Sequence, residues 1–138
     1  MPVGYVSGAA SPYDSRGFVA ADFDRDGDLD IFLVNNNQPS QYFENRASAT
    51  RHWVVVQLRG TRSNSHGIGA RVTLTANGKT QVREIHLGSG YLSSPAPEAH
   101  FGLGEARTIE KLTIRWPSGL RQTLERQAVN QVLIVTEK

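Results

Sequence analysis

Residues 69–87, GARVTLTANGKTQVREIHL, contain two runs of alternating polar and apolar side chains, separated by Asn77 and Gly78. Alternation with a period of two places Val72 and Leu74 on one face of an extended strand. Asn-Gly is a preferred pair for a type I′ turn, because both central residues of that turn have a positive φ. The stretch therefore predicts a β-hairpin, with strands over residues 69–75 and 80–87.

Similar patterns occur on both sides of this hairpin. They predict strands over residues 52–59, 111–116, 120–124 and 131–136, with a turn at Pro117-Ser118-Gly119. No window of ten or more residues keeps a helical period, although residues 120–129 have room for a short helical turn. The 13 glycines and 6 prolines among the 138 residues fit a turn-rich chain. We therefore predict an all-β protein whose residues 50–138 form a small antiparallel β-sandwich or barrel.

Residues 1–49 form a separate unit in this prediction. The run Ile31-Phe32-Leu33-Val34 predicts a short strand buried on both faces, and residues 41–44 follow as its hairpin partner. The chain up to about residue 15 lacks periodicity and predicts either a loop or an element that pairs with a segment not in this chain, while the polar segment 45–51 predicts a boundary. A unit of this size needs a staple or a partner in order to fold.

An acidic stretch in this first unit carries most of the negative charge. Five of the six aspartates fall within residues 22–30, where Arg25 is the single basic residue. Counted from Asp22, carboxylates stand at positions 1, 3, 5, 7 and 9 and Gly27 stands at position 6. Calcium takes six to eight oxygen ligands, and alternate side chains of a tight loop turn toward one centre. We expect calcium to be bound by the side chains of Asp22, Asp24, Asp26 and Asp30 and by the main-chain oxygen of Asp28.

Three other interpretations of the acidic loop are less favourable. An acidic turn without an ion would leave five carboxylates repelling one another. Magnesium is disfavoured by the number of ligands. An EF-hand is rejected because its twelfth position is Leu33 rather than glutamate and because the flanking residues predict strands.

At these residues the chain resembles known families. Residues 19–31, VAADFDRDGDLDI, are similar to the calcium loop of FG-GAP or VCBS repeats, which form blades of β-propellers. Four later motifs resemble, in order, those of the ASPIC/UnbV domain of cartilage-acidic-protein-like chains: GIGARV (67–72), GSGYLSS (88–94), HFGLG (100–104) and RWPSG (115–119). The resemblance implies a partial propeller-type blade followed by the β domain, as the C-terminal part of a larger repeat protein. It also implies an extracellular or periplasmic location.

The remaining residues argue against several classes of function. The chain has no cysteine, and its four histidines (His52, His66, His86 and His100) have no metal-ligand spacing. Gly88-Ser89-Gly90 lacks the spacing of a nucleophile elbow, and the glycine pattern at 67–72 breaks the dinucleotide fingerprint. Residues 88–104 predict tight turns where the chain crosses at the end of the sandwich, with Phe101 and Leu103 in the core. Trp116, just before the turn at 117–119, is also predicted to pack into the core. Twelve of the fifteen basic residues are arginines, which we interpret as a solvated face because no nucleic-acid-binding motif is present.

These observations predict a calcium-binding, non-catalytic interaction module with a protein or glycan partner. We expect no catalytic residue, no nucleic-acid partner, no membrane span and no signal peptide in this chain. A homo-oligomer through exposed strand edges is a further expectation. The alternatives are an accessory or enzymatic domain in natural-product biosynthesis, and a carbohydrate-binding module.

Overall fold

The computed structural model describes residues 10–46 and 51–138, and every regular element in these ranges is a β-strand. The ten strands are β1 (Ser15–Ala21), β2 (Asp30–Asn35), β3 (Gln41–Phe43), β4 (His52–Arg59), β5 (Arg71–Ala76), β6 (Lys79–Glu84), β7 (Glu98–Gly104), β8 (Ile109–Arg115), β9 (Arg121–Gln127) and β10 (Gln131–Thr136). The prediction of an all-β protein is confirmed. The predicted boundary between residues 49 and 50, and most of the predicted N-terminal loop, lie outside the described residues.

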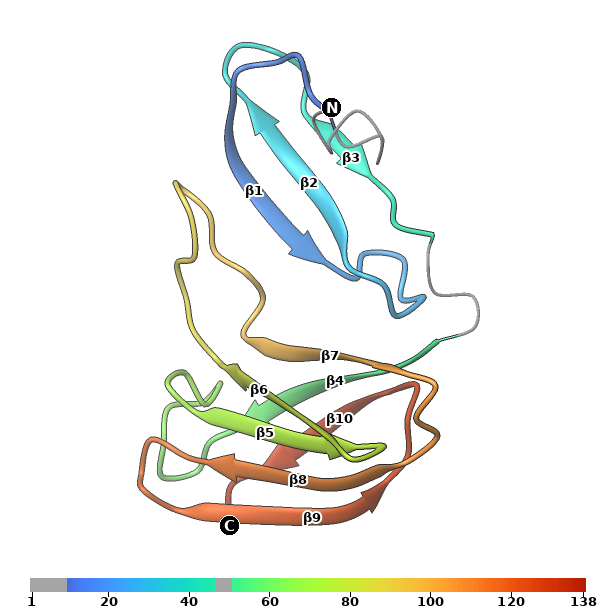
Figure 1. Ribbon diagram of the computed structural model, residues 1–138. Helices are drawn as coiled ribbons and strands as arrows, with labels where there is room; N and C mark the ends of the chain where they lie inside the picture. Colours follow the sequence, from blue (N-terminus) through green and yellow to red (C-terminus); the bar gives the residue numbers. More distant parts are fainter. Residues whose placement is uncertain (1–9, 47–50) are drawn as a thin grey trace.

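Strands β4–β10 form two sheets that pack face to face (Figure 1). One sheet has the order β10-β4-β7 and the other β6-β5-β8-β9. The predicted hairpin is β5–β6, in which Ala76 pairs with Lys79 and the turn residues Asn77 and Gly78 have φ values of 49° and 70°. Between the sheets, Phe101, Trp116 and the inward side chains of β4, β5 and β8 are buried in one core. Within the described residues the two sheets stay separate, so the arrangement is a sandwich and not a barrel.

Three features of the sandwich differ from the prediction. β10 runs parallel to β4, with Gln131 beside Val54 and Thr136 beside Arg59. The two strands can be parallel because the chain crosses from one sheet to the other between β9 and β10, where Asn130 N donates to Trp53 O (2.6 Å). β7 was not predicted: its residues form a full strand that pairs antiparallel with β4. The segment 121–127 is strand β9 and forms no helical turn.

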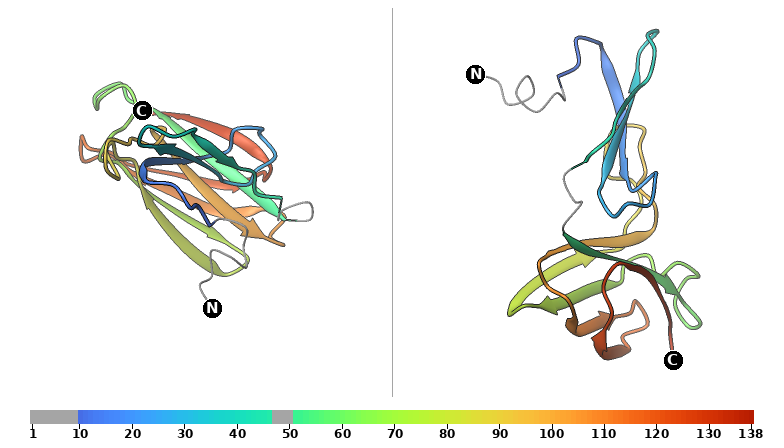
Figure 2. Two further views of the ribbon diagram at one scale, coloured as in Figure 1. Left: turned by 90° about the horizontal axis from the view of Figure 1, so that it is seen from above. Right: turned by 90° about the vertical axis from the view of Figure 1, so that its right-hand side faces the viewer.

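The remaining sheet, with the order β1-β2-β3, stands beside the sandwich (Figures 1 and 2) and is called the first sheet because it comes first in the chain. The predicted pairing of β2 with β3 is confirmed, but residues 15–21, which we had not predicted as a strand, form β1 on the other side of β2. The prediction that residues 31–34 are buried on both faces is wrong: Phe32 is 38% exposed and Val34 is 48% exposed. Phe32 and Val34 share one face of β2, and the apolar run alone could not show that this face is partly exposed.

The C-terminal end of the chain is held by a buried carboxylate. Glu137 accepts hydrogen bonds at Oε2 from the consecutive backbone N–H groups of Thr61, Arg62 and Ser63 (3.0, 2.9 and 2.7 Å). The hydroxyl groups of Ser63 (2.9 Å) and Ser118 (2.5 Å) donate to Oε1. Burial raises the pKa of Glu137, but these hydrogen bonds outweigh it and lower the pKa to about 2. The charged side chain thus joins the loop after β4, the turn after β8 and the end of β10.

Candidate metal centre

The acidic loop connects β1 to β2 and brings three carboxylates together. One carboxylate oxygen from each of Asp22, Asp24 and Asp26 lies within 4.8 Å of the other two. Two positive φ angles, 65° at Arg25 and 99° at Gly27, turn the backbone tightly enough for this. Among the described residues this is the one convergent group of three or more potential metal ligands.

Hydrogen bonds within the loop set its shape. Gly27 N donates to Asp22 Oδ2 (3.1 Å), Asp26 N donates to Asp24 Oδ1 (3.2 Å), and Asp28 N donates to Asp26 Oδ1 (2.8 Å). Each carboxylate therefore uses one oxygen to accept a nearby backbone N–H. The other oxygens remain available to a cation.

Two carboxylate oxygens of the loop are buried without a hydrogen-bond partner, Asp22 Oδ1 and Asp28 Oδ2. A buried acceptor without a partner is costly, and more so when it belongs to a charged group. Burial is also the largest influence on Asp22 and raises the pKa of its carboxyl, against the hydrogen bond from Gly27. A hard divalent cation would satisfy such oxygens, so the donor set fits calcium.

Asp30 has a different environment from the other four aspartates. It is fully buried, and it accepts hydrogen bonds from Asn45 N (2.8 Å), Phe23 N (3.3 Å) and the Tyr42 hydroxyl (2.8 Å). Burial raises the pKa of Asp30, but these three donors outweigh it and lower the pKa, while the carboxylate raises the pKa of Tyr42 to about 12. Asp30 thus ties the loop to the residues around β3.

The five predicted ligands are therefore distributed over three environments. Asp22, Asp24 and Asp26 converge, Asp28 lies outside this group and has one buried oxygen without a partner, and Asp30 lies in its own network of hydrogen bonds. The geometry of the first three is what the alternating spacing predicts. The hydrogen bonds to Asp30 could not be read from sequence, because Asn45 and Tyr42 reach it only through the pairing of β2 with β3.

The loop also contacts the sandwich. Gly27 is buried, and a Cβ added there would overlap the indole ring of Trp53 on β4. On β7, His100 Nε2 lies 2.8 Å from Gly27 O, a distance that places a donated N–H on that carbonyl. A second contact joins β1 to the loop after β6, where Phe18 N donates to Ser93 Oγ (3.0 Å). Sequence analysis missed the role of His100, because its partner is 73 residues away.

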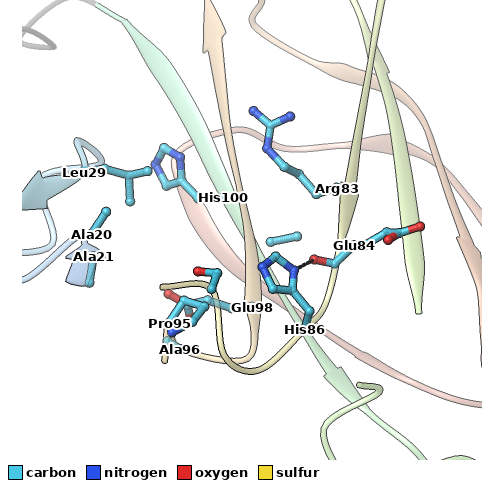
Figure 3. Close-up of a pocket in the computed structure, with 12 residues that line it drawn as sticks. Ala20, Ala21, Leu29, Arg83, Glu84, His86, Pro95, Ala96, Glu98 and His100 are labelled. Atoms are coloured by element: carbon cyan, nitrogen blue, oxygen red, sulfur yellow. Dashed lines mark hydrogen bonds between the residues drawn. The ribbon is translucent and has the colours of Figure 1, made fainter. Parts of the chain in front are cut away.

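A cleft of about 240 Å³ lies beside this contact (Figure 3). Ala20, Ala21 and Leu29 line it from the first sheet, and His86, Glu98 and His100 line it from the sandwich. His86 Nδ1 is 3.0 Å from the carbonyl oxygen of Glu84, and Gln57 donates to Glu98 (2.9 Å). His86 and His100 lie in different segments of the sequence, but both line this cleft.

The other predicted positions divide between core and surface. Phe101, Leu103 and Trp116 are buried, as predicted. Tyr91 is 67% exposed in the glycine-rich loop before β7. Among the described residues, no helix has the length and apolar character to cross a membrane.

Comparison with known proteins places the chain in a family. Residues 60–138 match the family model described as "ASPIC and UnbV". The chain is 37% identical over 125 residues to cartilage acidic protein 1 of Mus musculus. The matched region is 85% of this chain and 19% of that protein. It is 37% identical over 136 residues to cartilage acidic protein 1 of Xenopus tropicalis (91% of this chain, 20% of that protein) and 39% identical over 109 residues to the Homo sapiens protein (75% and 16%). The chain thus spans about a fifth of the length of these relatives. Because the family model covers more than half of its residues, the chain belongs to the ASPIC and UnbV family.

Proposed function

We propose that this chain is a calcium-binding, non-catalytic interaction module with a protein or glycan partner. The observation that carries the proposal is the convergence of Asp22, Asp24 and Asp26, in a loop where Asp22 Oδ1 and Asp28 Oδ2 are buried carboxylate oxygens without a hydrogen-bond partner. Oxygen donors in this number suit calcium, which acts as a structural ion when protein oxygens fill its coordination shell. The proposal includes an FG-GAP/VCBS-type repeat in residues 1–49, followed by the ASPIC/UnbV domain in residues 50–138.

The ion would hold the loop in the conformation that contacts the sandwich. Gly27 lies within the acidic loop, and its contacts with Trp53 on β4 and His100 on β7 join the first sheet to the sheet β10-β4-β7 of the sandwich. A loop of five uncompensated carboxylates repels itself, which opposes this conformation. Binding of calcium therefore stabilises the orientation of the two parts as well as the loop.

The non-catalytic part of the proposal rests on the chemistry of the loop. Calcium activates water poorly compared with zinc, and protein oxygens leave it few open positions. The relatives are named after cartilage, and this name supports an extracellular location for the module.

Calcium is expected to raise the melting temperature of protein that has been stripped with EGTA. A ligand that binds only the folded state adds about 2.7 kcal/mol at a hundredfold excess over its Kd, which corresponds to a rise in Tm on the order of 5–10 °C. Asp24→Ala and Asp26→Ala should remove most of this rise and most of the heat of binding in titration calorimetry. Asp14→Asn is the matched control, because Asp14 is an exposed aspartate outside the loop. A Tm that does not respond to calcium would contradict the proposal.

An enzymatic function is the second candidate, and the cleft with His86, Glu98 and His100 is the observation that favours it. Its test is a panel of glycoside, ester and phosphate substrates with the intact chain, His86→Gln and Asp26→Ala. We expect no turnover above buffer. Turnover by the intact chain that is lost in His86→Gln would contradict the non-catalytic proposal and indicate an enzyme.

Self-association is the last part of the proposal. Phe18, Phe32 and Val34 are exposed on the first sheet, and the outer edge of β3 pairs with no strand in the described part of the chain. Exposed strand edges are templates for pairing with another chain. Light scattering over a concentration series should show a dimer or larger species, with residues 41–43 of the edge strand β3 protected from hydrogen exchange. A monomer at every concentration would contradict this part alone.

A further inference from the structure

Three arginines lie side by side on the outer face of the sheet β6-β5-β8-β9. Arg71 on β5 is directly opposite Arg115 on β8, and Arg115 is directly opposite Arg121 on β9. Neighbouring strands are about 4.8 Å apart, so the three Cα atoms form a row about 10 Å long. All three side chains are exposed. We call this set of residues the arginine row.

A row of threonines runs beside the arginine row on the same face. Thr73, Thr113 and Thr123 are each two residues from an arginine along their own strands, and they pair across the sheet in the same order. The hydroxyls of Thr113 and Thr123 are 3.3 Å apart. Together Arg71, Thr73, Thr113, Arg115 and Arg121 line a hollow of about 250 Å³. Guanidinium forks and hydroxyl groups therefore face the same space.

Among the described residues, no acidic side chain forms an ion pair with the arginine row. The ion pairs found among the described residues are Arg16–Asp14 and Arg46–Glu44, and none of the three guanidinium groups has a hydrogen bond to any described residue. The acids nearest in register are at the margins of the face: Glu84 pairs with Arg71, and Glu125 pairs with Lys111. Like charges directly opposite one another destabilise a sheet. The row thus has a cost to stability that an anionic ligand would remove.

We propose that the arginine row binds a sulfated polysaccharide. Arginine presents planar, bidentate donors that match oxyanions, and it is weakly hydrated compared with lysine. Because the row crosses three strands, successive sulfate groups along one chain can each meet a different guanidinium, while the threonine hydroxyls are placed for sugar hydroxyls. A nucleic acid fits less well, because neither row contains an aromatic side chain on which a base could stack.

The arginine row lies far from the acidic loop. The acidic loop contacts β4 and β7 of one sheet, whereas β8 and β9 belong to the other sheet of the sandwich, on the side away from the loop (Figure 1). At separations beyond the Debye length, about 8 Å at physiological salt, the negative charge of the loop is largely screened. Binding of the polysaccharide is therefore expected to be independent of calcium.

Heparin is the probe for this surface, with the full chain in calorimetric titrations. We expect Arg115→Gln to weaken binding about tenfold, because a charge-assisted hydrogen bond contributes about that factor, and Arg71→Gln/Arg115→Gln/Arg121→Gln to remove it. Arg107→Gln is the matched control: Arg107 is exposed and lies before β8, at the opposite end of that strand from Arg115. Arg115→Lys keeps the charge but loses the fork, so its affinity should fall between those of the intact chain and Arg115→Gln. The triple variant should melt no lower than the intact chain, because the repulsion is relieved.

Further measurements distinguish a sulfated polysaccharide from free sulfate and from other polyanions. Fully desulfated heparin should not bind, and sodium sulfate at matched ionic strength should compete weakly. EGTA should leave heparin binding unchanged, so failure of the calcium proposal and failure of this one are distinguishable. Equal loss of affinity in the Arg107→Gln control, or absence of heparin binding, would overturn the proposal. Tighter binding of duplex DNA than of heparin, or full displacement by free sulfate, would also overturn it.

Discussion

Gly27→Ala is expected to lower the free energy of unfolding by about 3 kcal/mol. A non-glycine residue in the left-handed region costs about 1–2 kcal/mol, and overpacking of a closed contact costs about 1–3 kcal/mol more. Gly27 has a φ of 99° and its added Cβ would overlap the Trp53 ring, so both costs apply. Chemical denaturation measures the total. Hydrogen exchange over residues 15–35 shows whether the first sheet separates from the sandwich before global unfolding.

Gly78→Ala is the control for this prediction. Gly78 also has a positive φ, 70°, but a Cβ added there meets nothing within 4 Å. It should therefore cost only about 1 kcal/mol, and the difference between the two variants isolates the contact with Trp53. Equal losses in the two variants would mean that the loop does not rest on Trp53 in solution.

Glu137→Gln is expected to lower Tm by about 10 °C at neutral pH, because buried N–H and O–H donors lose a charged acceptor. The pH dependence follows from the pKa of Glu137, which is about 2 in the folded protein against an ordinary value of 4.5. A lowered folded-state pKa means that the unfolded chain takes up the proton first as pH falls. The stabilisation is therefore complete above about pH 5 and is lost progressively between about pH 4.5 and pH 2.

Melting curves over this pH range test the assignment. The difference in Tm between the intact chain and Glu137→Gln should be constant near neutral pH and should shrink as the pH approaches 2. Glu105→Gln is the matched control, because Glu105 is exposed, and it should follow the intact chain at every pH. If the difference in Tm does not change with pH, another group is responsible for the stabilisation.

Local chemistry explains the elements that the sequence predicted correctly. The β5–β6 hairpin depends on Asn77 and Gly78, which adopt the turn themselves. Alternation placed Leu112 and Ile114 on the buried face of β8, and Trp116 follows them into the core. In the acidic loop, spacing alone brings Asp22, Asp24 and Asp26 together, because alternate side chains of a tight turn share one side. Each of these predictions needs only residues within a few positions of one another.

The missed elements depend on partners that are distant in the chain. β7 contains two glycines, which are unfavourable in a strand, and β4 supplies the hydrogen bonds that hold it as a strand. β10 is parallel to β4 because the chain crosses between the layers at Asn130, a path that strand patterns do not encode. Glu137 likewise accepts hydrogen bonds from three backbone N–H groups that are more than 70 positions away in the chain.

The sequence by itself determined that this protein is all-β, where its hairpins turn, and that one loop concentrates carboxylates. Those properties follow from backbone preferences and side-chain periodicity, which act over a few residues. Only the tertiary structure decided that Gly27 rests on Trp53 and His100, that Asp30 is held by Tyr42 and Asn45, and that Arg71, Arg115 and Arg121 stand in one row. The physical reason is register: a shift of one residue in a strand pairing moves every side chain to the other face, and that pairing is set by the packing of the whole core.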